Sequence, residues 1–493
     1  MRAILKGGRF CRPIAVLVLA WAAAAAPSSG AAGPPRAVLS IYPGMALQAM
    51  AGFGAGFNGD QYFAKIARPE DRERAYDLLY GPQENGTRLS IVRLVVSDKA
   101  QETAPNSPLR ADGVLYDWGG DPGTQAVWRA IRPVLARIRP VIYAVPFSPP
   151  ARWKDSQSLN KGGRLRPDRY RDYAEYLADF LDYYRRTLKT EIDVLSLQNE
   201  PGIAAAWDSC LWTGEELRDF LKILAPAVRA RGLGPKLMLS EGTAWSGAWA
   251  HLEPALLDPE ARPLIGVLAS HSYGPAQDAA RARFAAASET YKLPVWMSEM
   301  SLMQPPELDD RTMKAALRVA DYVHRDIAAG RASAWIYCFG IFTYQFKGSM
   351  GLLSPADAPG EEGRFAVPKR FWALAQYSQF VRPGWKAVKV EATLNGAPLP
   401  DTRTNGFVSP DGEGFVVVSV NPTAAPVDAA YDFGPWTLGP EVESFVTSAD
   451  RDLAAGVVAA ARAAHAFAAS LPPESVTTFR GRLAKESPGR GAR

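Results

Sequence analysis

Short runs of apolar, β-branched residues alternate with longer amphipathic stretches between residues 51 and 339. Eight of the short runs have the character of strands. They are residues 50–53, 90–96, 141–146, 194–198, 236–240, 267–270, 295–298 and 334–339. Strands that alternate with helices build a parallel sheet, and eight such units close a barrel. The pattern therefore predicts an α/β fold, a (β/α)8 TIM barrel.

The amphipathic stretches support the same architecture. Residues 167–186 carry apolar and tyrosine side chains at helical spacing behind Pro167, which suits the first turn of a helix. Thr213 and Glu216 have the spacing of a capping box at a helix start. Both segments are expected to be outer helices whose apolar stripes pack on the barrel.

After residue 384 the pattern changes to short strands separated by turns, which predicts an attached β-sandwich side domain. An early segment with strand character precedes the barrel and can pair with this domain. The expected organisation is a signal peptide over residues 1–32, a sandwich strand over 33–50, the catalytic barrel over 51–384, the β-sandwich over 385–481 and a disordered tail over 482–493.

The first residues have the pattern of an export signal. Four basic residues precede an apolar run over residues 14–26, and small residues follow at 29–32. An N-terminal membrane anchor is the weaker alternative, because the run is short for a bilayer span of ~20 residues. Cleavage of this leader predicts a secreted or periplasmic protein with no stable membrane insertion.

Charge and cysteine content narrow the function classes. The 493-residue chain has a formal net charge of +5 at pH 7, and without the basic leader about +1 remains. So small a positive charge does not indicate binding to nucleic acid. The mature chain keeps Cys210 and Cys338. One disulfide between them is possible in an oxidising compartment, and two buried free thiols are favoured. The scattered histidines show no metal spacing, so neither a metal nor a cofactor is expected.

Two glutamates stand where predicted strands open into loops. Glu200 lies in the motif QNEP after the fourth strand, and Glu299 ends the motif WMSE of the seventh. Barrel enzymes assemble their sites at these strand ends. Retaining glycosidases place two carboxyls roughly 5 Å apart, one to protonate the leaving oxygen and one to attack the anomeric carbon. A lone glutamate there is usually an ion pair or a cap, but a matched pair favours catalysis.

Other polar residues at the strand ends are candidates for the same site. The amide of Asn199 suits a sugar hydroxyl. Arg93 is costly to bury unpaired, and Glu299 is favoured over Asp98 as its partner. Tyr273 is expected to donate a hydrogen bond to Glu299, with a strand cap as the alternative.

Three further ring side chains complete the candidate set. Trp335 in the eighth strand and Trp153 after the third can offer a flat face to a sugar ring. Core packing is an equal alternative for Trp335. For His271, a structural role and a substrate contact are equally supported.

These motifs make the chain resemble glycoside hydrolase family 30, in the clan of retaining (β/α)8 glycosidases. The resemblance covers residues 48–479. In one-letter code its pieces are GFGAGF (52–57), LSIVR (89–93), SPPA (148–151), LNKGG (159–163), the two glutamate motifs, HSYG (271–274), KRFW (369–372), FVRPG (380–384) and LPPESVTTF (471–479). NEP alone is shared by the whole clan, whereas the ordered set is specific to the family.

The resemblance implies a side β-sandwich built from both termini and metal-free retaining hydrolysis. It implies β-linked carbohydrate substrates such as glucans, xylans, galactans or glucosylceramide-like lipids. By position, Glu200 is the acid/base and Glu299 the nucleophile. The residues implied to line the sugar site are Asn199, Arg93, Tyr273 and Trp335.

At two places the chain departs from the family pattern, which limits the residue roles and substrates that can be carried over from the family. Many members carry Trp directly after the SPPA stretch, where this chain has Arg152 and then Trp153. Members specific for glucuronoxylan carry an Arg-rich loop after strand eight, where this chain offers only Lys347. Glucuronoxylan specificity is therefore not predicted. A catalytically idle glycan-binding protein and a transglycosylase with the same site remain as alternatives.

Overall fold

The computed structural model describes residues 37–83, 85–102, 115–274, 277–303, 312–342, 344–345, 348–355, 363–399, 401, 403–459 and 464–485. The predicted leader over residues 1–32 lies outside these ranges. Within them, the helices are too short or too polar to cross a bilayer.

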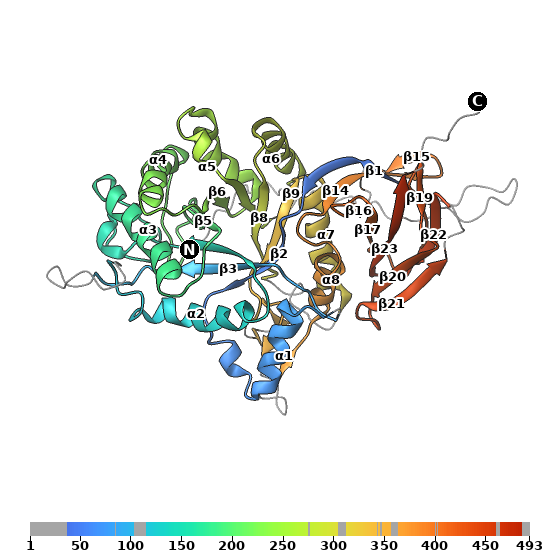
Figure 1. Ribbon diagram of the computed structural model, residues 1–493, viewed down its shortest axis with the longest axis horizontal. Helices are drawn as coiled ribbons and strands as arrows, with labels where there is room; N and C mark the ends of the chain where they lie inside the picture. Colours follow the sequence, from blue (N-terminus) through green and yellow to red (C-terminus); the bar gives the residue numbers. More distant parts are fainter. Residues whose placement is uncertain are drawn as a thin grey trace, which may run out of the picture.

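Eight parallel strands close into a barrel, with the last strand hydrogen-bonded back to the first (Figure 1). The strands are β2 (Gly52–Phe57), β3 (Ile91–Val96), β4 (Val141–Pro146), β5 (Val194–Ser196), β6 (Lys236–Gly242), β7 (Val267–His271), β8 (Val295–Met300) and β9 (Ala332–Tyr337). Each coincides with a predicted strand to within a few residues at its ends. The predicted (β/α)8 barrel is therefore confirmed.

Helices follow the strands and surround the barrel. They are α1 (Pro69–Tyr80), α2 (Pro122–Leu135), α3 (Tyr170–Arg186), α4 (Gly214–Ala230), α5 (Trp245–Leu257), α6 (Asp278–Tyr291), α7 (Met313–Ala328) and α8 (Lys369–Ser378). A 3-10 turn over Pro167–Arg169 leads into α3. The predicted capping box is present at the start of α4, where Thr213 and Glu216 each bond to the other's backbone N–H. Two small ribbons lie in the segment after β9: β10 (Tyr344–Gln345) with β11 (Gly348–Ser349), and β12 (Ser354–Pro355) with β13 (Phe365–Ala366).

A second, mostly antiparallel β domain lies beside the barrel (Figure 1). Its strands are β1 (Ala37–Ala49), β14 (Lys386–Leu394), β15 (Ala397–Leu399), β16 (Thr404–Val408), β17 (Gly414–Asn421), β18 (Val427–Asp432), β19 (Trp436–Leu438), β20 (Glu441–Thr447), β21 (Ala454–Ala459), β22 (Ala466–Leu471) and β23 (Ser475–Lys485). They are ordered β21-β20-β23-β17-β16-β14-β1-β18-β22, with β15 on β14 and β19 on β23.

Both ends of the described chain enter this domain. Strand β1 pairs antiparallel with β14 and parallel with β18, so the N-terminal segment is an inner strand of the sheet. Strand β23 continues to Lys485, which corrects the prediction that a disordered tail begins at residue 482. The last residues of this strand have a polar, glycine-containing composition typical of a disordered tail, so the strand was predicted to end too early. Pairing with β17 and β19 holds it, and Leu483 is buried in the domain core.

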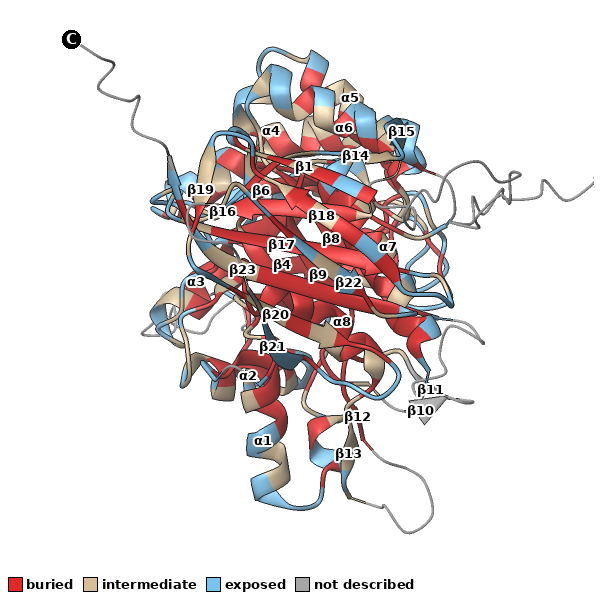
Figure 2. Ribbon diagram, turned by 90° about the vertical axis from the view of Figure 1, so that its right-hand side faces the viewer, coloured by how far each residue is buried: buried red, intermediate tan, exposed pale blue. Residues whose placement is uncertain are grey.

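The sheet has two buried faces. On one face Phe415 and Val417 belong to the core of the β domain. On the other, Val416 and Val418 pack into the core that surrounds the barrel, where α7 and α8 contact the sheet. Figure 2 shows the central strand β17 buried along almost its whole length. This two-sided burial joins the two domains.

Candidate active site

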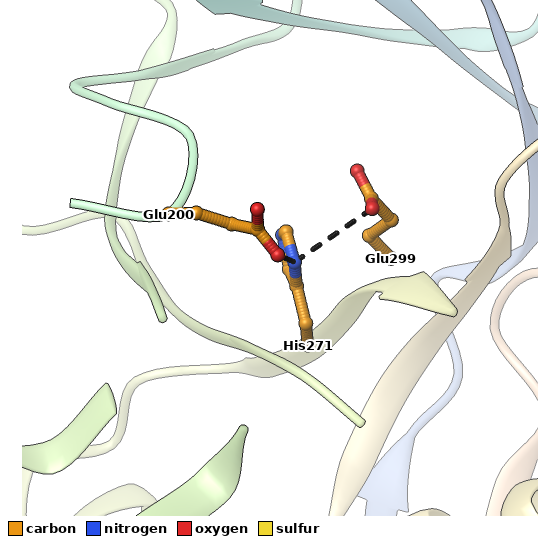
Figure 3. A group of neighbouring side chains, drawn as sticks. All are labelled: Glu200, His271 and Glu299. Atoms are coloured by element: carbon orange, nitrogen blue, oxygen red, sulfur yellow. Dashed lines mark hydrogen bonds and ion pairs between the residues drawn. The ribbon is translucent and has the colours of Figure 1, made fainter. Parts of the chain in front are cut away.

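Two carboxylates meet at the carboxyl ends of the barrel strands. Glu200 follows β5 in a left-handed conformation with φ +46°, and its N–H donates to the carbonyl of Glu241 at 3.0 Å. Glu299 lies within β8, next to its last residue. One oxygen of each carboxylate lies within 4.8 Å of the other. Figure 3 shows the two carboxylates on either side of His271. The exposed fractions of the two residues are only 8% and 9%.

Arg93 of β3 contacts both Glu299 and the side-chain amide of Asn199. Its Nη2 lies 2.6 Å from Glu299 Oε2 and donates to Asn199 Oδ1 at 2.7 Å. Burial alone would lower the pKa of Arg93, but Glu299 and the neighbouring acidic groups together raise the pKa well above its usual value, so the side chain stays a cation. Asp98 has Lys99 as its cation instead, at 3.7 Å. The favoured pairing of Arg93 with Glu299 is therefore present.

Tyr273 occupies the other oxygen of Glu299. Its O–H donates to Oε1 at 2.9 Å, which is the expected hydrogen bond. Burial and then the charge of Glu299 raise the pKa of Tyr273, so it remains a donor. With Arg93 on one oxygen and Tyr273 on the other, Glu299 is held as an oriented carboxylate.

His271 lies among three carboxylates. Its Nδ1 is 3.2 Å from Glu200 Oε1 and 3.9 Å from Glu299 Oε1, and its Nε2 is 3.6 Å from Glu241 Oε1 (Figure 3 shows the first two). Burial alone would lower the pKa of His271, but Glu299, Glu200 and Glu241 together raise the pKa to about 10. The ring is therefore a cation at neutral pH, and both nitrogens are donors.

The reasoning from sequence missed Glu241. This residue is fully buried in β6 with φ +49°, and it accepts a hydrogen bond from the Tyr143 hydroxyl. Burial alone would raise the pKa of Glu241, but the nearby His271, with Nε2 at 3.6 Å, and the charge of Arg93 act in the opposite direction, and the pKa is lowered. Glu241 directly follows the predicted strand over residues 236–240. The strand-end rule that found the other two glutamates would have found it as well.

The same cluster offers ligand atoms for a cation. Glu200, His271 and Glu299 each contribute one atom, and these atoms lie within 4.8 Å of one another. A histidine must be neutral to bind a metal. The surrounding carboxylates raise the pKa of His271 to about 10, so without a bound cation its ring acts as a hydrogen-bond donor.

A cavity of about 610 Å³ opens beside the two glutamates. Asn199 and Tyr273 line it, together with Glu200 and Glu299. Further described lining residues include Val95, Phe147, Trp207, Asp208, Lys99 and Phe342. The cavity therefore combines charged groups at its base with apolar walls.

Trp335 lies elsewhere, and the prediction that it lines the sugar site is wrong. The residue is fully buried, and its indole N–H donates to Asp326 Oδ2 at 2.9 Å. Its neighbours Ala334 and Ile336 pack in the barrel interior. Successive residues of a strand point to opposite faces, so Trp335 points outward to the helical layer.

Trp153 is also a packing residue. Its exposed fraction is 5%, and its ring meets those of Tyr176 and Tyr173 on α3 at centroid distances of 5.7 and 6.5 Å. Arg152 lies over the same ring at 4.6 Å. Trp153 is absent from the described lining of the cavity, so its predicted role as a sugar platform is not supported.

Both cysteines of the described chain are buried and free, as favoured from the sequence. Cys338 lines the cavity, with its Sγ 4.0 Å from Nη1 of Arg93. Burial and the charge of Glu299 raise the pKa of Cys338, so the group is a neutral thiol rather than a nucleophile. Lys347 lies outside the described residues.

A (β/α)8 barrel with two converging carboxylates at the ends of its strands has the arrangement of a glycoside hydrolase. The model of O-glycosyl hydrolase family 30 matches residues 97–352. The chain belongs to this family, which confirms the resemblance and implies a carbohydrate substrate.

Relatives of known activity are distant. Glucuronoxylanase XynC of Bacillus subtilis is 25% identical over 358 residues, covering 69% of this chain and 73% of that protein. A family 30 endoxylanase from Clostridium papyrosolvens has a similar fold, with a TM-score of 0.68 at 24% identity over 90% of this chain and 99% of that one. The endo-β1,6-glucanase BT3312 has a TM-score of 0.68 at 18% identity over 91% and 94%. Xylanases and β-glucanases are thus among the distant homologues.

Proposed function

We propose that this protein is an exported retaining hydrolase of β-linked glycans of the glucan, xylan or galactan type. The separation of Glu200 and Glu299 carries the proposal, since an oxygen of each lies within 4.8 Å of the other. Retaining enzymes hold their carboxyls about 5–5.5 Å apart, whereas inverting enzymes need about 6.5–9.5 Å to admit a water.

In the first step Glu299 attacks the anomeric carbon as the bond to the leaving oxygen breaks. Arg93 and Tyr273 each contact one oxygen of the Glu299 carboxylate and orient it before the attack. Glu200 gives its proton to the leaving oxygen. His271 Nδ1 donates to Glu200 Oε1, so the transferable proton resides on Oε2. The products are a covalent glycosyl-enzyme and a released alcohol.

In the second step Glu200, now a carboxylate, takes a proton from the water that attacks the anomeric carbon, and Glu299 leaves. Asn199 contributes to binding in both steps. Its Oδ1 accepts from Arg93, which leaves the amide N–H₂ to donate to a substrate hydroxyl at the cavity.

The charge of the cavity favours a neutral glycan. Among the described lining residues, Asp98, Asp121 and Asp208 join Glu200 and Glu299, and Lys99 is the one lysine. Like charges repel, so this lining disfavours the acidic side group of glucuronoxylan. We therefore do not transfer the substrate in the name of XynC to this chain.

Product analysis tests the proposal. Wild type and Glu299→Gln are incubated with β-glucans, xylans, galactans and aryl β-glycosides. Release from one class, abolished by the substitution, is the expected result. Glycan binding without turnover by either protein would instead make this an idle glycan-binding protein. Products longer than the substrate would identify a transglycosylase.

Export rests on the N-terminal sequence alone. The basic region and apolar run of residues 1–32 support a cleaved leader and a secreted or periplasmic protein. N-terminal sequencing of the mature protein is expected to begin near residue 33. An intact N-terminus on membrane-bound protein would establish an anchor instead.

A further inference from the structure

Trp207 is an exposed tryptophan at the cavity that contains the nearly buried carboxylates of Glu200 and Glu299. Its exposed fraction is 58%, and it lines the cavity that contains Glu200 and Glu299. Exposure of so large an apolar side chain leaves its surface in water, which burial by a ligand would relieve. The two tryptophans expected from the sequence to stack on sugar pack elsewhere, so Trp207 is the tryptophan among the described lining residues.

The backbone that carries Trp207 is firmly held. Ala205 accepts a hydrogen bond from the N–H of Lys161 at 2.7 Å, and Asp208 forms a bridge with Asn160. The Ser209 hydroxyl donates to the carbonyl of Trp207 at 3.1 Å. An exposed side chain on a fixed backbone is arranged in advance to receive a ligand.

A polar pair adjoins the indole. Lys99 Nζ, in the segment after β3, lies 3.6 Å from Asp208 Oδ2, in the loop between β5 and α4. Both residues line the cavity, and the side chain of Lys99 is 61% exposed. A flat apolar face beside exposed donors and acceptors matches the two kinds of surface on a sugar ring.

The loop that holds Trp207 also contains Glu200, which indicates on which side of the cleaved bond such a ring lies. Glu200 opens this loop, and in the proposed mechanism it must touch the leaving oxygen. Glu299, which must touch the anomeric carbon, comes from β8. Residues of the Glu200 loop that line the cavity are therefore placed toward the leaving group.

We propose that Trp207, Asp208 and Lys99 form a binding site for a sugar ring of the leaving group. This inference rests on the proposed hydrolase function and sharpens it, because it makes the leaving group a saccharide rather than a lipid. The indole of Trp207 covers the apolar face of the ring, and the Lys99–Asp208 pair bonds to hydroxyls at its edge.

The test compares two leaving groups on one sugar. Hydrolysis of β-linked tetrasaccharides of xylose and of glucose is measured beside that of the matching aryl β-glycosides, for wild type, Trp207→Ala, Trp207→Phe and Leu257→Ala. Leu257, on α5, is 68% exposed and lies outside the described lining of the cavity, so it controls for loss of a surface apolar group.

Trp207→Ala is expected to lower kcat/KM on the tetrasaccharide about tenfold more than on the aryl glycoside, mainly through KM. Trp207→Phe should recover most of this loss, and Leu257→Ala should keep the wild-type ratio. An equal loss on both substrates, or no loss, would overturn the site. So would a wild type that cleaves only the aryl glycoside.

A binding measurement distinguishes failure of the proposed hydrolase function from failure of the proposed sugar-binding site. If wild type turns over neither substrate, calorimetric titration with the same tetrasaccharides reports on the site directly. Binding that disappears in Trp207→Ala would retain the sugar site in a protein without hydrolase activity. Binding that is absent from wild type, or unchanged by the substitution, would remove the site as well.

Discussion

Replacing Arg93 with methionine tests the central ion pair of the site. Arg93 is fully buried, and its Nη2 contacts Glu299 Oε2 at 2.6 Å and Asn199 Oδ1 at 2.7 Å. Methionine fills much of the same space without charge or donors. The substitution therefore leaves Glu299 as a nearly buried carboxylate that has lost its closest cation, with His271 remaining at 3.9 Å.

The expected cost follows from that uncompensated charge. Breaking a buried ion pair by removing one partner costs about 3–5 kcal/mol of unfolding free energy, and the lost bond to Asn199 is part of that sum. In Arg93→Met/Glu299→Gln the remaining charge is gone. The double variant should therefore lose about 1–3 kcal/mol less than the two single losses added together. Activity of Arg93→Met should fall about 100-fold, because Glu299 and Asn199 lose their orientation.

Urea unfolding of the four proteins at pH 7 measures the coupling. Intrinsic fluorescence and circular dichroism should be followed together, because a chain of two domains need not unfold in one step. Strictly additive losses in the double variant would refute the reasoning. A loss below about 1 kcal/mol in Arg93→Met would do the same, since it would mean that the carboxylate is not desolvated.

Three further predictions follow from individual contacts. The pKa of His271 in the folded protein, about 10, lies above its ordinary value of 6.5, so the protonated ring stabilises the fold fully below pH 6.5 and this stabilisation is lost as pH rises through 10. His271→Gln should therefore flatten the decline of the unfolding free energy between those pH values. An unchanged decline would contradict the assignment. Trp335→Phe removes the donor to Asp326 and should cost about 1–3 kcal/mol in urea unfolding while KM stays at its wild-type value; a raised KM would place the residue at the sugar site after all. Glu200→Ala should slow glycans far more than activated aryl glycosides in steady-state assays, because only the former need a proton on the leaving oxygen; equal slowing would remove its role as acid.

The positions of the barrel strands could be predicted from local patterns of apolar and polar residues. All eight barrel strands follow from short apolar runs between amphipathic helices, and the strand ends locate Glu200 and Glu299. The contact from Tyr273 to Glu299 was expected for the same reason, since Tyr273 follows β7 and Glu299 lies at the end of the neighbouring parallel strand β8. Such inferences succeed because the carboxyl ends of parallel strands meet on one side of a barrel.

The direction of a side chain within a strand was harder to infer. Ala334 and Ile336 point into the barrel and Trp335 points outward, yet the run is apolar throughout and has no alternation to show it. A strand that is buried on both faces lacks the period of two that would mark its inner face. The position of Glu241 at a strand end was visible in the sequence, but no distinctive motif marks it, and only the structure shows that its carboxylate is fully buried.

The barrel, the side domain and the places of the two glutamates could be predicted because they depend on the order and spacing of elements along the chain. The groups that surround the glutamates are set by contacts between distant segments. Closure of the barrel brings Glu241 and His271 to Glu200 and sets Arg93 on Glu299. It also leaves Trp207 exposed at the cavity while burying Trp153. These contacts join residues far apart in the chain, and their distances depend on the register of neighbouring strands, which local patterns do not encode.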